Sequence, residues 1–333
     1  VYTVSLFTIA LLSGLAFRWR DHLGEGKDDN IILLMVFILA LSVGNHLMAF
    51  LAAPALIVFI LWVEPRTLTN WKLYAAAVAA IFLGLSIHFY LPLRAALNPV
   101  INEADPSCPS FGSAVQSVIT MGRSGCTYLS EALSRTQYDK PSMFANPVDP
   151  SLPRDINLLI AQIGNYFQYF DWQWARSLSG NNGWFGGIRP VFTILFIVLG
   201  FHGATTHFRR DKKSWAFVAV LFATLSLGLT FYLNFKYGFT FPGDNIGSNE
   251  REVRERDYFF IVSFSIWGLW AGIGLAAFWQ WLGEKWLRVT RPDEQMPPLA
   301  AAPVLLIALL PLLMNWPWAD RRHGYSAPVW ANN

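Results

Sequence analysis

Arginine and acidic residues alternate through positions 249–257, directly before an apolar stretch that begins at Tyr258. A guanidinium group presents a planar fork of hydrogen-bond donors to phosphate oxygens, and it stays charged at every physiological pH. Arg254 and Arg256 are therefore candidate phosphate ligands, and Asp257 is a candidate to orient one of them. The alternative is structural: Asp257 caps a helix that starts at Tyr258, while the arginines pair with neighbouring glutamates or extend into water.

Three other polar residues are candidates for the same phosphate. Asn45 and His46 lie inside the apolar run 31–63, where a polar group is costly unless it is hydrogen-bonded. His46 could bind the phosphate or an acceptor, or it could only satisfy the free carbonyls of a turn. Arg94 follows a full apolar run, and a lone arginine in that position is more often a membrane anchor than a ligand.

The carboxylates that could act as a general base are Glu103, Asp105 and Asp171. Transfer of a group to a hydroxyl needs such a base to remove the hydroxyl proton. Each of the three also fits an ordinary turn or surface residue. The spacing of Asn102, Glu103 and Asp105 lacks the glycine of a calcium loop, and no Cys and His spacing matches a zinc site. We expect no metal cofactor, with a divalent ion as an open alternative.

The composition places these residues in a membrane protein. Hydrophobic residues make up 54% of the chain and charged residues 14%, whereas ordinary soluble domains are about 25% charged. Several apolar runs reach the ~20 residues that cross a hydrocarbon core of ~30 Å. The predicted membrane-spanning runs are 1–17, 31–63, 71–93, 190–208, 214–233, 258–282 and 299–315.

The run 31–63 is too long for one span. A helix of its length would measure about 50 Å, and Gly44, Asn45 and His46 lie at its middle. We therefore split it, which predicts an all-α integral membrane protein with about eight transmembrane helices. With eight spans, four short basic loops share one side, the cytoplasmic side by the positive-inside rule. Those loops carry Arg18, Arg20 and Lys27; Arg66 and Lys72; Arg209, Arg210, Lys212 and Lys213; and Lys285, Arg288 and Arg291.

The opposite, exoplasmic face then carries the segment 94–189 and the loop 234–257. The predicted organisation is one multi-span domain over 1–318, followed by the start of an exoplasmic region at 319–333. Within 156–174, apolar residues recur at helical spacing among several Tyr and Trp residues, which predicts an amphipathic helix lying on the surface at the membrane interface. A helix that only caps the bundle is the alternative. Cys108 and Cys126 either form a disulfide on this oxidising face or remain two thiols.

Several short motifs occur together in one order. They are Ser-Val-Gly-Asn-His-Leu at 42–47, Asn-Pro-Val-Ile-Asn at 98–102, Tyr-Leu-Asn at 232–234, Arg-Glu-Arg-Asp-Tyr at 254–258 and Asn-Trp at 315–316. In these motifs the chain resembles a family of multi-span proteins long described as of unknown function. Its eukaryotic member resembles an endoplasmic-reticulum O-mannosyltransferase acting on plexin-type receptor domains, grouped with the GT-C membrane glycosyltransferases.

The resemblance implies a GT-C-like fold and an inverting transfer of a mannose-like sugar from a polyprenyl-phosphate donor to an exoplasmic acceptor hydroxyl, on a protein Ser or Thr. It also implies that the acidic base lies in a first exoplasmic loop of the family that this chain lacks. On that basis we expect a fragment that is inactive by itself. Its partners would be the lipid bilayer, the lipid-linked sugar and an exoplasmic protein or glycan, in a bacterial plasma membrane or the endoplasmic reticulum membrane.

Two other classes of function stay open. A transporter or flippase would also span the membrane many times, but transporters usually carry ionisable residues deep inside their spans. Here only His46 and His88 are ambiguous in that respect. A transferase acting on a lipid or glycan acceptor is the second alternative, and nothing in the sequence separates it from the protein acceptor. The net charge of +3 says little about partners in a membrane protein, and nucleic acid is not indicated.

Overall fold

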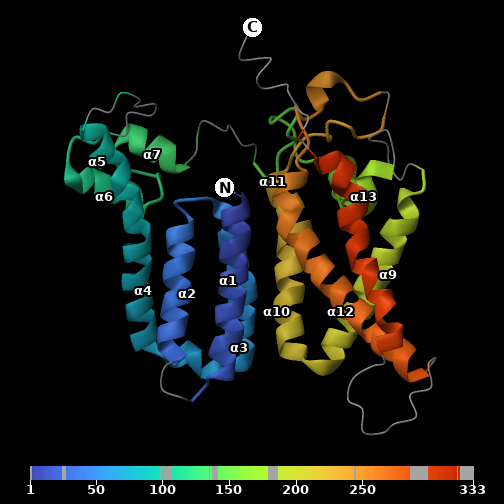
Figure 1. The fold of residues 1–333 in the computed structure, drawn as a ribbon. Helices are drawn as coiled ribbons and strands as arrows, with labels where there is room; N and C mark the ends of the chain where they lie inside the picture. Colours follow the sequence, from blue (N-terminus) through green and yellow to red (C-terminus); the bar gives the residue numbers. More distant parts are fainter. Residues whose placement is uncertain are drawn as a thin grey trace. The chain divides into compact units, whose positions relative to one another are not determined.

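The computed structural model describes residues 2–24, 28–97, 100, 107–134, 136, 142–178, 187–243, 245–285, 299–320 and 322. This part of the chain is helical, with two isolated bridges and no longer strand among the described residues (Figure 1). The predicted all-α class is therefore confirmed. The chain divides into two compact units, the first comprising 1–153 with 216–224 and the second 154–215 with 225–333.

The first unit is built on four apolar helices and a small helical subdomain. Its helices are α1 (Tyr2–Asp21), α2 (Asp28–Ser42), η1 (Leu47–Ala52), α3 (Ala53–Val63), η2 (Pro65–Thr69), α4 (Trp71–Leu85), η3 (Ser86–Phe89), α5 (Tyr90–Ala96), α6 (Phe111–Ile119) and α7 (Thr127–Ser134).

The long apolar run is divided into α2 and η1–α3 at Gly44, as predicted. α2 and α4 run in the same direction, because Asn70 before α4 donates a 3.0 Å hydrogen bond to Asp29 at the start of α2, and Gly84 near the end of α4 meets the end of α2. A Cβ on Gly84 would lie 2.6 Å from the Cβ of Ala40, so only glycine allows this approach. Since α2 and α4 are parallel, the chain returns to the start of α4 through η1 and α3.

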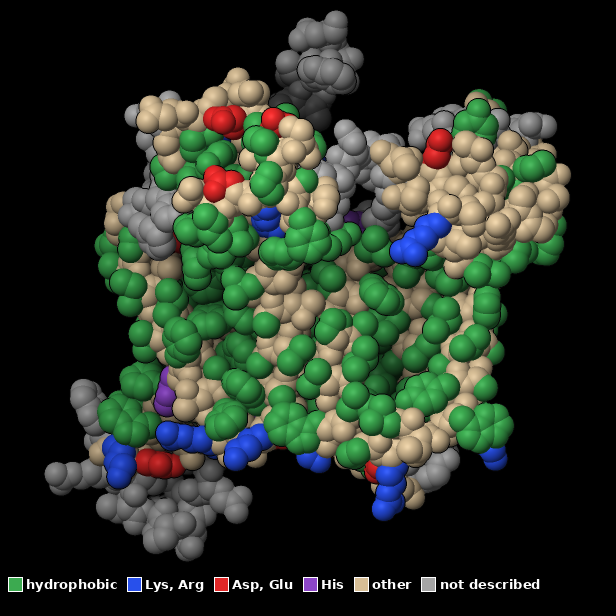
Figure 2. All heavy atoms as spheres, turned by 180° about the vertical axis from the view of Figure 1, so that it is seen from behind, with side chains coloured by type: hydrophobic (Ala, Val, Ile, Leu, Met, Phe, Trp, Pro, Cys, Tyr) green, Lys and Arg blue, Asp and Glu red, His purple; other side chains and the backbone are tan. Residues whose placement is uncertain are grey.

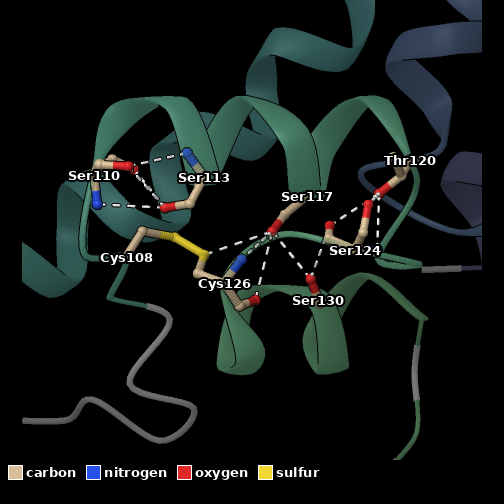
Figure 3. The surroundings of a disulfide bond; sticks show 8 residues. All are labelled: Cys108, Ser110, Ser113, Ser117, Thr120, Ser124, Cys126 and Ser130. Carbon is tan, nitrogen blue, oxygen red and sulfur yellow. Dashed lines mark hydrogen bonds between the residues drawn. A yellow bond between two sulfur atoms is a disulfide. The ribbon is translucent and has the colours of Figure 1, made fainter.

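The subdomain after α5 is held by a disulfide between Cys108 and Cys126, whose Cα atoms are 5.3 Å apart (Figure 3). This resolves the alternative that the sequence left open. Ser117 Oγ accepts a 2.9 Å hydrogen bond from Cys126 N and contacts Ser130 Oγ at 3.0 Å, so α6 is tied to the start of α7. The small core of Ala114, Val118 and Leu129 packs against residues of η3 and α5.

The second unit is built around α8 and the pair α9–α12. Its helices are α8 (Ile156–Ala175), η5 (Arg176–Leu178), α9 (Arg189–Arg210), α11 (Leu229–Leu233), η7 (Ser248–Glu250), η8 (Asp257–Phe260), α12 (Ile261–Lys285), η9 (Leu299–Leu309) and α13 (Leu310–Ala319). Helix α10 (Lys212–Ala223) has residues in both units and continues through the π-helical turn η6 (Thr224–Gly228) into α11.

Helices α9 and α12 pack in direct backbone contact. A Cβ on Gly203 would lie 1.7 Å from the carbonyl oxygen of Trp270, and one on Gly274 would lie 2.0 Å from that of Leu199. Trp267 adds a 3.0 Å hydrogen bond from its indole Nε1 to the carbonyl of Phe196. Small residues at such positions let two membrane helices approach closely and gain van der Waals contact.

By length and hydropathy, six helical stretches of the described residues can cross a membrane: Tyr2–Asp21, Trp71–Ala96, Arg189–Arg210, Lys212–Leu233, Asp257–Lys285 and Ala301–Ala319. Two shorter apolar stretches, Asp29–Ser42 and Leu47–Val63, correspond to the divided run. The protein is therefore a multi-pass membrane protein. Over the second unit, at the left of Figure 2, hydrophobic side chains cover the middle of the helices and Lys and Arg gather at their lower end.

Helix α8 differs from its prediction in one respect. It forms at 156–175 as expected and exposes Ile156, Ile160 and Phe167, but its aromatic C-terminal end is enclosed in its unit. Tyr169, Trp172 and Trp174 are all buried, and Trp174 stacks on Phe196 of α9 with ring centroids 4.5 Å apart. The aromatic residues interpreted as a membrane-interface belt are instead core residues, because α9, α12 and α13 supply apolar partners from elsewhere in the chain.

Candidate functional site

One polar edge of α8 organises the loop that carries the arginine cluster. Gln162, Asn165 and Gln168 are fully or almost fully buried, and they follow each other at intervals of three residues along one side of the helix. Gln162 Nε2 donates to the carbonyl of Phe235 directly after α11. The loop 234–256 thus begins at a hydrogen bond to α8.

The next two polar side chains of α8, those of Asn165 and Gln168, also attach the loop to the helix. Asn165 Oδ1 accepts a 2.9 Å hydrogen bond from Gly238 N, and Gln168 Nε2 donates to Thr240 Oγ1 at 3.1 Å. A Cβ on Gly238 would lie 2.2 Å from Asn165 Nδ2. Glycine is therefore required for the backbone to reach this close to the helix.

Glu255 closes the attachment at the far end of the loop. Its carboxylate accepts hydrogen bonds from Tyr169 Oη at 2.8 Å, Thr240 N at 2.8 Å and Thr240 Oγ1 at 2.6 Å. Burial raises the pKa of the Tyr169 hydroxyl above its usual value, and the negative charge of Glu255 raises it further. Tyr169 and Thr240 thus hold Glu255 and attach the end of the loop to α8.

Arg256 is held by an acidic neighbour. Its Nε donates to Glu252 Oε2 at 2.9 Å, and Nη1 reaches Tyr258 Oη at 3.4 Å. Burial lowers the pKa of the Arg256 guanidinium, but the hydrogen bonds to Glu252 and Tyr258 outweigh that effect and leave the pKa raised. For Arg256 the structure thus shows the pairing with a neighbouring glutamate that was the structural alternative.

Arg254 is arranged differently from Arg256, although only one residue separates them. Its side chain is exposed, and its guanidinium carbon lies 5.4 Å from the centre of the Tyr258 ring. A cation over an aromatic face keeps its charge while its orientation is restricted. Arg254 is therefore the candidate of this loop that presents hydrogen-bond donors at the surface.

Asp257 orients an arginine that the sequence analysis missed. Its Oδ2 lies 3.9 Å from Nη1 of Arg176, whose guanidinium is sandwiched between the rings of Trp172 and Trp318 at 4.0 and 4.1 Å. Asn315 Oδ1 of α13 accepts a 2.7 Å hydrogen bond from Arg176 N, which holds α13 against the end of α8. In the sequence, only the Trp-rich end of α8 indicated a stacked arginine at this position. The other partners of Arg176, Asp257 and Trp318, come from far along the chain.

The candidate bases are distributed as follows. Asp171 is fully buried and forms an ion pair with Arg189 and a 2.5 Å hydrogen bond from Thr193 Oγ1, so both of its oxygens are engaged in joining α8 to α9. Glu103 and Asp105 lie outside the described residues. Within the described ranges, no three His, Cys, Asp or Glu side chains gather as a potential metal site.

The remaining candidates belong to the first unit. His46 Nδ1 accepts a 3.1 Å hydrogen bond from Met48 N, which caps η1, and the ring of Tyr2 lies 5.3 Å from that of His46. Asn45 and Arg94 are exposed, in the turn before η1 and on α5. The structure thus brings Arg254, Arg256 and Asp257 together with Arg176 in one unit, and Asn45 and His46 together in the other.

These features define a multi-pass membrane protein with a structured, arginine-bearing loop between two of its apolar helices. Residues 1–69, from α1 to η2, match the family model described as the N-terminal domain of the protein O-mannosyl-transferase TMEM260. That match supports the family resemblance of the sequence motifs and suggests a glycosyltransferase. No curated protein and no solved structure matches the chain.

Proposed function

We propose that this protein is a membrane glycosyltransferase of inverting GT-C type, which moves a mannose-like sugar from a polyprenyl-phosphate donor to a Ser or Thr hydroxyl of an exoplasmic protein. The observation that carries the proposal is the match of residues 1–69 to a domain of a protein O-mannosyl-transferase. The membrane-spanning helices agree with a donor whose tail lies in lipid.

The transfer makes three chemical demands. A carboxylate takes the acceptor proton, hydrogen-bond donors stabilise the charge left on the departing phosphate, and water must be excluded. The described residues offer groups for the stabilisation of the phosphate charge. Arg254 supplies an exposed guanidinium in the second unit, with Arg256 and Asp257 beside it. Asn45, His46 and Arg94 of the first unit are alternative candidates for the same role.

The activity is tested with the full-length natural protein, reconstituted in vesicles, and a radiolabelled polyprenyl-phosphate mannose. We expect label to appear on Ser or Thr of an acceptor protein domain. Transfer to a glycan or lipid only would replace the acceptor in the proposal. Movement of the labelled lipid across the bilayer without any transfer would contradict the enzyme and favour the transporter.

Arg254 provides the residue-level test. Replacing it with alanine removes hydrogen bonds to a charged group worth about 1.5–3 kcal/mol, so kcat/KM should fall about 10- to 100-fold. Arg254→Lys should recover part of the loss. The matched control is Lys285→Ala, an exposed cation at the other end of α12. Equal activity of Arg254→Ala and Lys285→Ala would remove Arg254 from the site.

We also propose that the two shorter apolar helices complete eight spans and that the loop 234–256 faces the exoplasm. Single cysteines report this directly, because Cys108 and Cys126 are bonded to each other. A membrane-impermeant thiol reagent should label Ser248→Cys from the exoplasmic side and Lys212→Cys only from the cytoplasmic side. The reverse pattern would overturn the proposed topology.

A further inference from the structure

The turn between α9 and α10 carries four basic side chains in five positions, and the proposed transfer of sugar uses none of them. Arg209 and Arg210 end α9, Lys212 and Lys213 begin α10, and only Asp211 lies between the two helices. Arg209, Arg210 and Lys212 are exposed, and Lys213 is half-buried. They belong to the second unit, at whose lower end Lys and Arg side chains gather in Figure 2.

The lengths of the flanking helices place this turn at the depth of the lipid headgroups. The apolar stretches Arg189–Arg210 and Lys212–Leu233 each have 22 residues, which corresponds to about 33 Å of helix. That length matches a hydrocarbon core of ~30 Å. Because a single residue joins the two stretches, the basic side chains have no extended loop that could carry them away from the membrane surface.

The charges of this turn are not neutralised within the described part of the chain. None of the four basic side chains forms an ion pair with a described residue, whereas Arg189, Arg256 and Arg322 of the same unit each pair with a carboxylate. The one acid of the turn is used locally, because the carboxylate of Asp211 accepts hydrogen bonds from Lys213 N and Ser214 N, both at 3.1 Å. The turn therefore keeps an excess of positive charge at the membrane surface.

Two of the cations stand where their own helix disfavours them. The N-terminus of a helix carries a partial positive charge, so acidic residues are stabilising there and basic residues are not. Lys212 and Lys213 nevertheless occupy the first turn of α10. A local rule that is broken without a partner inside the protein indicates a functional position. An anion bound at this turn would remove the conflict, since both the lysines and the helix end attract it.

The turn is also fixed in shape by side chains of its own unit. Trp270 Nε1 of α12 donates to His207 Nδ1 at 3.3 Å, so the imidazole carries its proton on Nε2 and donates to Ser214 Oγ at 2.8 Å. This chain of hydrogen bonds connects the end of α9, the start of α10 and the middle of α12. The positions of the cations are thus set before any ligand binds.

An aromatic pair lies beside the cations. The rings of Phe208 and Trp215 meet edge to face with centroids 5.0 Å apart, and Lys212 Nζ lies 5.5 Å from the centre of the Phe208 ring. Phe208 is 41% exposed. Aromatic side chains at the ends of membrane helices prefer the headgroup region, so the pair holds the turn at the depth where phosphates lie.

We propose that Arg209, Arg210, Lys212 and Lys213 form a binding site for the headgroup of an anionic phospholipid. Charge complementarity and depth select this ligand: the site is cationic, rigid and level with the headgroups of the surrounding bilayer. In the proposed topology the turn faces the cytoplasm, and the cytoplasmic leaflet is where anionic phospholipids are concentrated. The inference does not depend on the transfer of sugar, because it concerns a lipid that is neither donor nor acceptor.

The test is photolabelling of the full-length protein in nanodiscs made mostly of phosphatidylcholine. Two probes carry the same diazirine next to the glycerol, one in phosphatidylserine and one in phosphatidylcholine. The phosphatidylserine probe should label the peptide of the α9–α10 turn at least about fivefold more than the phosphatidylcholine probe, the effect expected of a single cation near an anionic surface. Raising the salt from about 0.15 M to about 1 M shortens the Debye length from ~8 Å to ~3 Å and should reduce this preference.

The double variant Lys212→Gln with Lys213→Gln separates lipid binding from folding. Labelling by the phosphatidylserine probe should fall at least about fivefold, and labelling by the phosphatidylcholine probe should not change. In a zwitterionic detergent without anionic lipid, its melting temperature should be unchanged or higher, because the two charges no longer oppose the helix end. Arg209→Gln with Arg210→Gln repeats the test outside α10 if the first variant does not fold.

The matched control removes two exposed cations from the other unit. Arg66 lies in η2 and Lys72 in the first turn of α4, and both are exposed. They are separated by five residues instead of lying together. Arg66→Gln with Lys72→Gln should leave the labelling of the α9–α10 turn as it is in the natural protein.

Several outcomes would overturn the inference. Equal labelling of the turn by the two probes would mean that it only touches bilayer lipid without selecting a headgroup. An equal loss in the control variant would mean that the attraction comes from the overall charge and not from this turn. Competition by soluble glycerol phosphate as strong as that by unlabelled phosphatidylserine would make the turn a site for a free phosphate compound. The absence of sugar transfer would leave the lipid site standing, since the labelling needs no activity.

Discussion

The loop 234–256 of the second unit and the turn 43–46 of the first unit differ in how much charge they carry and in what surrounds their polar groups. The loop is rich in charge, and most of that charge is used internally: Glu252 holds Arg256, and Tyr169 and Thr240 hold Glu255. The turn has two polar side chains and adjoins an apolar groove between α2, η1, α3 and α4, whose lining offers no hydrogen bonds. Dense charge in a sequence thus does not by itself indicate hydrogen-bond donors that are open to a ligand.

The reason lies in the cost of leaving polar groups unpaired. A buried polar group without a partner costs about 1–3 kcal/mol. The polar groups of a charged loop that packs on a helix must therefore form hydrogen bonds within the protein before any of them can bind a ligand. Arg254 is exposed and stacks on Tyr258, so its donors are at the surface. The candidates of both units can therefore be ranked by how far their donors are already committed.

Among the substitutions proposed here, the replacement of Asp171 is expected to lower the free energy of unfolding most. Replacing Asp171 with alanine leaves the buried guanidinium of Arg189 without its counter-ion, and breaking such a pair costs about 3–5 kcal/mol. The full-length protein should lose that much unfolding free energy in denaturant titrations in detergent.

The double variant Asp171→Leu with Arg189→Met is the control. Because it removes both charges, it should be markedly more stable than the single variant. A single variant as stable as the natural protein would show that the pair does not hold α8 to α9, and would return Asp171 to the candidate bases.

Gly84 gives the next largest effect, and it concerns the helices that form the groove. An added Cβ there meets Ala40 Cβ, Leu41 N and Phe37 O at 2.6–2.9 Å, so Gly84→Ala should destabilise the protein by about 1–3 kcal/mol. The matched change is Gly14→Ala in α1, where nothing lies within 4 Å; it should stabilise by about 0.5–1 kcal/mol. Thermal unfolding of both variants measures the difference, and equal melting temperatures would contradict the close α2–α4 contact.

The sequence predicted the membrane helices well, because a long apolar run has few alternatives to a helix in lipid. It also predicted the division at Gly44, since a run of that length exceeds the bilayer and has polar residues at its middle. The pairing of Cys108 with Cys126 could not be predicted, because it depends on how α6 and α7 fold against each other.

Contacts between distant segments explain what the sequence did not reveal. The aromatic residues of α8 have the composition of an interface belt, and only the packing of α9, α12 and α13 against them makes them core residues. Arg176 was missed because its partners Asp257 and Trp318 come from loops and helices far along the chain. Its neighbours in sequence offer only Trp172 as a stacking partner.

Tyr169 gives the smallest expected effect and tests whether the loop depends on α8. Tyr169→Phe removes the hydrogen bond to Glu255, at a cost of about 1–2 kcal/mol at neutral pH. Tyr128→Phe, an exposed residue of α7, is the control and should be neutral. Unfolding free energies of the two variants in the same detergent measure the difference.

The same variant has a pH signature with a defined sign. The folded protein holds the Tyr169 proton more tightly than the unfolded chain, because burial and Glu255 raise the pKa of its hydroxyl. Stability is therefore complete below the unfolded pKa of about 10 and falls as the pH rises above it. Burial also raises the pKa of Tyr166, to about 12, so that residue contributes in the same direction. Tyr169→Phe should decline less steeply than the natural protein between pH 9 and 11, and identical slopes would show that the Tyr169 hydroxyl is not buried against the loop.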